Sequence, residues 1–183
     1  MKKDLQILKK MQDLKEYFDK EATIYVDMDG VVANYYKAYR EAISLYPEQA
    51  YPQAQYKFFE NLEPIYGAIE AMRFLNKYFN VFLLTRPSFR NPLNYTEKRV
   101  WVEKYLGIDM CKKLMLAPDK TVVRGDFLID DNVHTGLFEP EWEHIHFGSE
   151  KFPGWVSVIS YLDEEYNLKR HLDGDIIKFL DND

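Results

Sequence analysis

Short apolar runs alternate with amphipathic segments along the chain of 183 residues. Near-continuous apolar runs, typical of strands buried on both faces, lie at about residues 23–27 and at 81–84, 114–116 and 127–129. Residues 144–147 predict a last strand. Because segments with helical spacing separate these runs, strand and helix alternate, and this order predicts a parallel sheet.

Apolar residues at helical spacing predict helices over residues 34–46, 67–79 and 155–162. A further helix is predicted to about Leu106, with Asn94 or Thr96 as its N-cap and Gly107 as its C-terminal cap. The predicted fold class is therefore α/β, with a Rossmann-like parallel sheet and helices on both faces.

Leu5, Leu8, Met11 and Leu14 predict an amphipathic helix over residues 2–20, before the first strand. This helix either packs on the body of the protein or pairs with a second copy in a homodimer.

The stretch after the first predicted strand is unusual for a connection between two strands. Residues 47–66 contain three prolines and many aromatic residues. We interpret residues 34–66 as a small helical insertion that covers the site. With the helix that follows, this gives a cap of residues 34–78, a core of residues 21–33 and 79–183, and an N-terminal helix of residues 1–20.

Charge and composition narrow the classes of function. A net charge of −6 argues against a surface that binds polymeric nucleic acid, although a single nucleotide can still bind in a local pocket. No apolar run approaches the roughly 18 residues of a membrane span. The single cysteine, Cys111, and the lack of an apolar signal core lead us to expect a cytoplasmic protein that does not contact a membrane.

The first strand leads into two acidic residues, Asp27 and Asp29, followed by Gly30. Residues two apart on a strand share a face, so both carboxylates can reach one centre. Two like charges held so close need a cation or a shared proton. The alternative is a solvated turn, in which Asp and Gly are ordinary residues.

Other strands also end in polar residues: Thr85, a loop with Lys120, and the pair Asp130 and Asp131. Parallel strands bring these ends to one edge of the sheet. Carboxylates favour a hard cation such as Mg²⁺, and a hydroxyl and an ammonium group suit phosphoryl oxygens. An acid that attacks phosphorus and a second acid two residues on form a nucleophile and general-acid pair. A cation site without catalysis is the competing interpretation.

These residues resemble the motifs of the haloacid dehalogenase superfamily of phosphohydrolases. The matching stretches are Asp27-Met28-Asp29-Gly30-Val31-Val32, Leu84-Thr85, Lys120 and Asp126-Phe127-Leu128-Ile129-Asp130-Asp131. Longer segments make the chain similar to the 5'(3')-deoxyribonucleotidases in particular: residues 58–64, 97–103, 119–126 and 142–145. The resemblance extends from about residue 23 to residue 148.

The resemblance implies a mechanism. Asp27 would attack phosphorus and form an aspartyl-phosphate, and Asp29 would protonate the leaving sugar oxygen and then activate water. Mg²⁺ would be held by the Asp27 carboxylate, the backbone carbonyl of Asp29 and Asp130, with Asp131 beside this shell.

The resemblance also implies which residues bind substrate. Thr85 and Lys120 would bind the phosphoryl oxygens. Tyr35 stands where the family has an aromatic residue against the base. Arg86 and Lys98 complete the set of substrate-binding candidates.

Departures from the family pattern concern the substrate more than the chemistry. The insertion is short, with no tryptophan between Val31 and Phe82. Arg86 stands where the family has a small hydroxyl residue, and Asn132 stands where a basic residue is common. Arg86 is a candidate to replace the lost positive charge.

The expected function is a Mg²⁺-dependent phosphatase, a 5'-nucleotidase that acts on deoxyribonucleoside or ribonucleoside monophosphates. The alternatives are a phosphatase for another small phosphate ester and a non-catalytic module that binds phosphate or metal.

Overall fold

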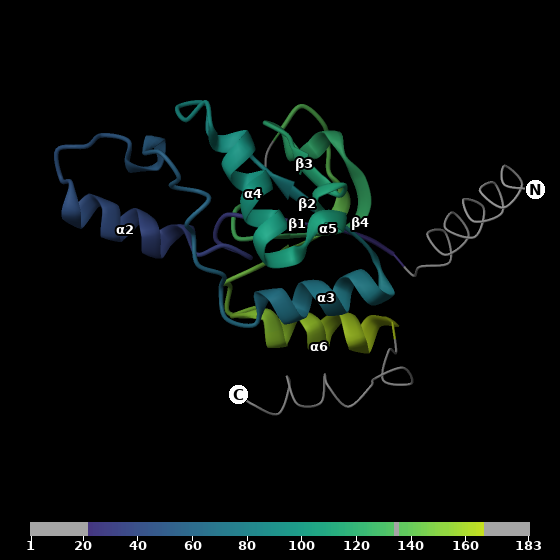
Figure 1. Cartoon of the computed structure of the whole chain (residues 1–183). Helices are drawn as coiled ribbons and strands as arrows, with labels where there is room; N and C mark the ends of the chain where they lie inside the picture. The colour runs from purple at the N-terminus through teal and green to yellow at the C-terminus, as the bar shows by residue number, and fades with distance from the viewer. Residues whose placement is uncertain (1–21, 134–135, 167–183) are drawn as a thin grey trace, which may run out of the picture.

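The core of this computed structural model, which describes residues 22–133 and 136–166, is a five-stranded parallel sheet (Figure 1). The strand order is β3-β2-β1-β4-β5. The strands are β1 (Thr23–Val26), β2 (Asn80–Thr85), β3 (Leu114–Leu116), β4 (Arg124–Asp130) and β5 (Glu141–His146). All four pairings are parallel, so the predicted α/β sheet is confirmed.

The central strand is β1, the strand that leads into Asp27. Its Ile24 pairs in register with Val81 of β2 on one side and with Phe127 of β4 on the other. Ile24 and Val26 are fully buried, as expected for an apolar run between two neighbouring strands. The residue that follows this strand therefore starts from a rigid position in the middle of the sheet.

One face of the sheet carries the main core. It packs against α3 (Ala68–Tyr78), α4 (Asn94–Leu106), α5 (Ile108–Cys111) and α6 (Trp155–Tyr166), and Figure 1 shows α3 lying beside α6. On the other face, Tyr25, Leu84 and Leu128 pack with Val123, next to the short 3-10 helix η2 (Lys120–Val122).

The start of α4 corrects one prediction. Neither Asn94 nor Thr96 is its N-cap, because the helix begins at Asn94 itself and Leu93 holds the cap position without a side-chain bond. The Asn94 side chain instead accepts the N–H of Ser88, at 2.9 Å. The helix ends as predicted, with Gly107 at its C-cap in a positive-φ conformation.

The insertion contains α2 (Tyr35–Leu45), the 3-10 helix η1 (Pro52–Ala54) and irregular turns up to residue 66. Figure 1 shows α2 standing away from the layers of the core, and none of its residues is buried. The two ends of the insertion meet in an antiparallel β-bridge between Ala33 and Pro64. The insertion thus leaves and re-enters the core at one place.

The helix α3, which the sequence placed at the end of the cap, lies in the layer with α6 and contacts α4. The predicted helix over residues 2–20 and the tail from residue 167 lie outside the described residues. Among the helices that the structure describes, none has both the length and the apolar character needed to cross a membrane.

Candidate active site

Polar residues follow three neighbouring strands where each one ends. Asp27 comes directly after β1, while Thr85 and Asp130 are the last residues of β2 and β4. They line a cavity of about 350 Å³. The core also contributes Asp29, Arg86, Pro87, Ser88, Lys120, Asn132 and Val133 to its lining, and the insertion contributes Tyr35, Tyr36, Gln53 and Phe59. The sheet thus brings together the residues predicted from its strand ends.

The turn after β1 depends on Gly30. Its φ of +88° lies in the left-handed region that side chains rarely adopt. A Cβ atom there would lie 2.4 Å from Oδ2 of Asp131 and 2.9 Å from the ring of Tyr36. Only glycine lets this turn pass so close to Asp131.

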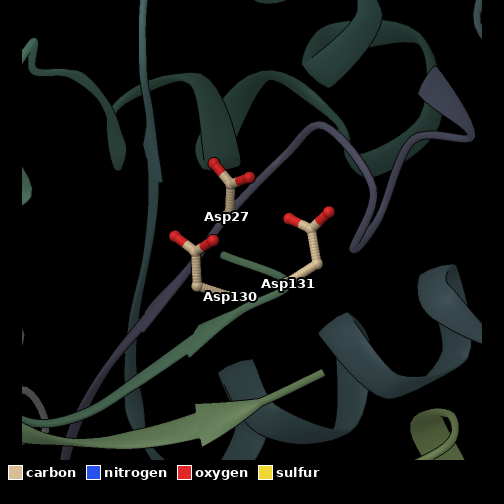
Figure 2. Close-up of side chains that lie close together, drawn as sticks. All are labelled: Asp27, Asp130 and Asp131. Atoms are coloured by element: carbon tan, nitrogen blue, oxygen red, sulfur yellow. The ribbon is translucent and has the colours of Figure 1, made fainter. Parts of the chain in front are cut away.

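Three carboxylates gather at this turn. One oxygen from each of Asp27, Asp130 and Asp131 lies within 4.8 Å of the others. Figure 2 shows the three carboxyl groups pointing to the same side, from the ends of β1 and β4. Asp27 and Asp130 are buried. Burial raises the pKa of Asp27 to about 7; the Lys120 ammonium opposes this rise, and the charges of Asp130 and Asp29 add to it.

Lys120 lies between two of these carboxylates. Its ammonium is 2.5 Å from Oδ1 of Asp27 and 2.6 Å from Oδ2 of Asp130, and the side chain is almost fully buried. Burial alone would lower the pKa of Lys120, but the two carboxylates outweigh it and the pKa is raised.

This donor set fits a metal. The three clustered acids supply oxygen ligands only, which hard cations prefer. Three acids beside one ammonium also leave negative charge that a cation would offset. The side chain of Asp29 is not part of the cluster, and its predicted contribution through the backbone carbonyl stays a prediction.

The acidic pair at the end of β4 is held from several sides. Asn132 donates its backbone N–H to Asp130 and its side-chain N–H to Asp131, both at 2.9 Å. The hydroxyl of Tyr36 donates to Oδ2 of Asp131, at 2.8 Å. The Nε2 atoms of His144 and His146 lie 3.0 and 3.1 Å from the backbone oxygens of Asp130 and Asp131.

Lys98 binds the second acid of the motif. Its ammonium lies 2.8 Å from Oδ2 of Asp29, 2.6 Å from Oγ1 of Thr85 and 2.8 Å from the backbone oxygen of Arg86. The side chain of Lys98 is fully buried. Of the predicted substrate-binding residues, Tyr35, Thr85, Arg86 and Lys120 line the cavity, whereas Lys98 lies behind Asp29 and Thr85.

The insertion forms an aromatic wall of the cavity. Tyr35 stacks on Phe59, with ring centroids 6.2 Å apart and an angle of 23° between the rings. Gln53 lies in the same wall, and its side-chain oxygen is buried without a hydrogen-bond partner in the described part of the chain.

Sequence reasoning did not identify Tyr36, Gln53 or Ser88 as site residues. Tyr36 had a local signal, because it follows Tyr35 at the start of the helix after the motif. Ser88 also had one, because it follows the end of β2 by three residues. Gln53 had none, since it lies in the insertion and away from every strand end.

Sequence comparisons place the chain among nucleotidases. A sequence model of the family described as "5' nucleotidase, deoxy (Pyrimidine), cytosolic type C protein" matches residues 44–139. A protein of Vibrio phage KVP40, provisionally named a 5'(3')-deoxyribonucleotidase, is 37% identical over 146 residues, which cover 78% of this chain and 85% of the phage protein.

Two human proteins are also similar. The mitochondrial 5'(3')-deoxyribonucleotidase is 33% identical over 157 residues, which are 68% of this chain and 69% of that protein. The cytosolic type is 44% identical over 94 residues, which are 49% of this chain and 47% of that protein. The match to the cytosolic protein thus spans about half of its length.

Proposed function

Because the chain belongs to the 5'(3')-deoxyribonucleotidase family of phosphoric monoester hydrolases, within the haloacid dehalogenase superfamily, we propose that it is a Mg²⁺-dependent phosphatase of nucleoside monophosphates. The observation that supports this most is the arrangement of two acids, each paired with its own buried lysine, at the end of β1. One acid acts as nucleophile and the other as general acid and base.

Asp27 is the nucleophile of the proposal. Lys120 contacts its Oδ1 and holds the carboxylate at the floor of the cavity. A carboxylate oxygen of Asp27 bonds to phosphorus while the bond from phosphorus to the sugar oxygen breaks. The product of this first step is an aspartyl-phosphate and a nucleoside.

Asp29 is the general acid and then the general base. Its Oδ2 is held by Lys98, so Oδ1 is the oxygen that carries the proton. Oδ1 gives this proton to the leaving sugar oxygen. In the second step it takes a proton from the water that attacks phosphorus, and inorganic phosphate leaves as the Asp27 carboxylate is restored.

The remaining polar residues bind and orient the phosphoryl group. The Thr85 hydroxyl and the Lys120 ammonium line the cavity beside Asp27 and suit phosphoryl oxygens. Lys98 acts through Asp29 and Thr85 and is therefore a positioning residue. Asp27, Asp130, Asp131 and the backbone carbonyl of Asp29 would hold Mg²⁺, which supplies positive charge against the phosphoryl oxygens.

The aromatic wall supports a nucleotide as the substrate. Tyr35, whose ring stacks on the buried ring of Phe59, offers apolar surface to a flat base, and Gln53 offers an amide group to its polar edge. Arg86 lies in the cavity lining next to Thr85, where its charge suits the anionic substrate.

Phosphate release from a panel of substrates tests this proposal. The panel contains deoxyribonucleoside and ribonucleoside 5'- and 3'-monophosphates and several sugar phosphates, each with Mg²⁺ and with chelator. We expect activity that chelator abolishes and Mg²⁺ restores, with preference for deoxyribonucleotides. Activity mainly on sugar phosphates would overturn the substrate assignment, and no turnover at all would favour a module that only binds phosphate or metal.

The homodimer expected from the sequence stays a prediction. The same holds for the location in the cytoplasm, because the human relatives include both a cytosolic and a mitochondrial protein.

A further inference from the structure

We propose that Glu97, a buried carboxylate in the first turn of α4, is a positioning residue that fixes the insertion as the nucleoside-facing wall of the cavity. This role rests on the proposed function, since it concerns how the same site holds its substrate. The comparisons and the motifs around Asp27 assign Glu97 no function.

The two carboxylate oxygens of Glu97 bind the backbone of the insertion. Oε1 accepts the N–H of Lys57, at 2.8 Å, and Oε2 accepts the N–H of Phe59, at 3.0 Å. Glu97 is only 3% exposed. A carboxylate withdrawn from water is costly unless hydrogen bonds replace its hydration, and here backbone donors of the insertion do so.

The backbone at Lys57 needs this support. Its φ of +63° is the only positive value at a non-glycine residue in the described part of the chain. A side chain in this left-handed region is strained, and such residues persist where their surroundings hold them. The bond from the Lys57 N–H to Glu97 fixes this strained turn directly before Phe58 and Phe59.

Asn91 extends the same contact to a second part of the insertion. Its side-chain N–H group donates to Oε2 of Glu97, at 3.4 Å, and to the backbone oxygen of Gln53, at 3.2 Å. Asn91 is 2% exposed. The backbones of Gln53 and Phe59, both of which line the cavity, are therefore attached to the core through one buried polar cluster.

The position of Glu97 in α4 separates this role from catalysis. Lys98, the next residue, holds Asp29 and Thr85 through its ammonium group, and it meets the insertion at the ring of Phe59, 5.1 Å from the ring centroid, rather than through the backbone bonds that Glu97 makes. A change at Glu97 should therefore loosen the wall against the base and leave the catalytic groups in place. Its effect should depend on whether the substrate has a base.

The test compares Glu97→Gln with wild type on a deoxyribonucleoside monophosphate and on phenyl phosphate, which lacks sugar and base. Glutamine keeps the shape but has one acceptor oxygen in place of two. We expect KM for the nucleotide to rise about tenfold, and kcat/KM for phenyl phosphate to fall by less than about threefold. Glu103→Gln, on the exposed side of α4 where Glu103 pairs with Arg99, is the matched control and should match wild type.

Hydrogen exchange gives a readout that does not depend on turnover. In Glu97→Gln, the amides of Lys57 and Phe59 should exchange at least about tenfold faster, with little change at the amides of β1. If Glu97→Gln does not fold, Asn91→Ala is the replacement variant, and it should also raise KM for the nucleotide.

Equal losses on both substrates would overturn the proposal, because Glu97 would then support the whole core. Unchanged amide exchange at Lys57 and Phe59 would also overturn it. A failure of the proposed function would give a different result, because the wild-type protein would then hydrolyse phenyl phosphate but no nucleotide. That result would also rule out a role for Glu97 in holding a wall against the nucleoside.

Discussion

Lys98 binds one oxygen of Asp29 and leaves the other, Oδ1, without a hydrogen-bond partner in the described part of the chain. The two oxygens of one carboxylate are thereby made different. The ammonium group is fully buried, while the Asp29 side chain is 24% exposed at the cavity. This arrangement holds the carboxylate in one orientation and leaves Oδ1, which is itself buried, as the oxygen that we propose for proton transfer.

Replacing Lys98 with methionine should therefore lower kcat. Methionine fills a similar volume but cannot hold Asp29 or Thr85, and loss of orientation at a reacting group can cost roughly 100-fold. We expect kcat to fall roughly 10- to 100-fold on nucleotide and phenyl phosphate alike, with a small change in KM. Steady-state kinetics check this, with Lys112→Met as the control at an exposed lysine. A rise in KM alone would instead show that Lys98 binds substrate directly.

Asp29→Asn should lower turnover sharply and preserve binding. The amide oxygen can still accept from Lys98, but the side chain can neither give nor take the required proton. General acid–base catalysis is worth roughly 10²- to 10⁴-fold, so kcat should fall by that factor. Calorimetry should find Mg²⁺ and inorganic phosphate bound within about threefold of wild type. Activity equal to wild type would remove Asp29 from the mechanism; Asp109→Asn, at an exposed aspartate, is the control.

Asp27→Asn should prevent formation of the covalent intermediate, because an amide is not a competent nucleophile for phosphorus. Wild-type protein quenched in acid during turnover should carry phosphate on Asp27, which mass spectrometry of the digested protein can locate. The variant should carry none. An acid-stable, Mg²⁺-dependent phosphoenzyme in Asp27→Asn would show that another residue attacks phosphorus.

Gly30→Ala should weaken metal binding as well as stability. The left-handed conformation alone costs an alanine about 1 kcal/mol. At Gly30 the new Cβ would also meet Asp131 at 2.4 Å and displace that carboxylate. Gly148 has a similar φ of +81° but open space around it. Gly148→Ala therefore measures the loss of stability caused by the positive φ alone, without a steric clash. The check is the melting temperature measured with and without Mg²⁺. Mg²⁺ should raise the melting temperature of Gly30→Ala by less than that of wild type, whereas the rise in Gly148→Ala should equal that in wild type.

The sequence predicted the sheet and the polar residues that gather at one edge of it, because both follow from local patterns. Apolar runs predict buried strands, and parallel strands place the residues after them at one edge. Asp27, Thr85, Lys120 and Asp130 therefore meet in the cavity as expected.

The other face of the site was not predictable in this way. Helix α4 buries Asn94, Glu97 and Lys98 beside Trp101 and Val102, so its apolar pattern does not mark its inner face. A glutamate in the first turn of a helix usually faces solvent, where its negative charge interacts favourably with the positive end of the helix dipole. Only the fold of the insertion against α4 shows that Glu97 is buried and what it binds.

The contacts of Glu97 have a consequence for how such a protein can diversify. Its hydrogen bonds reach backbone N–H groups, which every residue except proline carries. The attachment therefore does not depend on which side chains the attached segment has. Evolution, or a protein engineer, can exchange side chains at positions such as Gln53 and alter substrate choice while the phosphate chemistry is inherited unchanged.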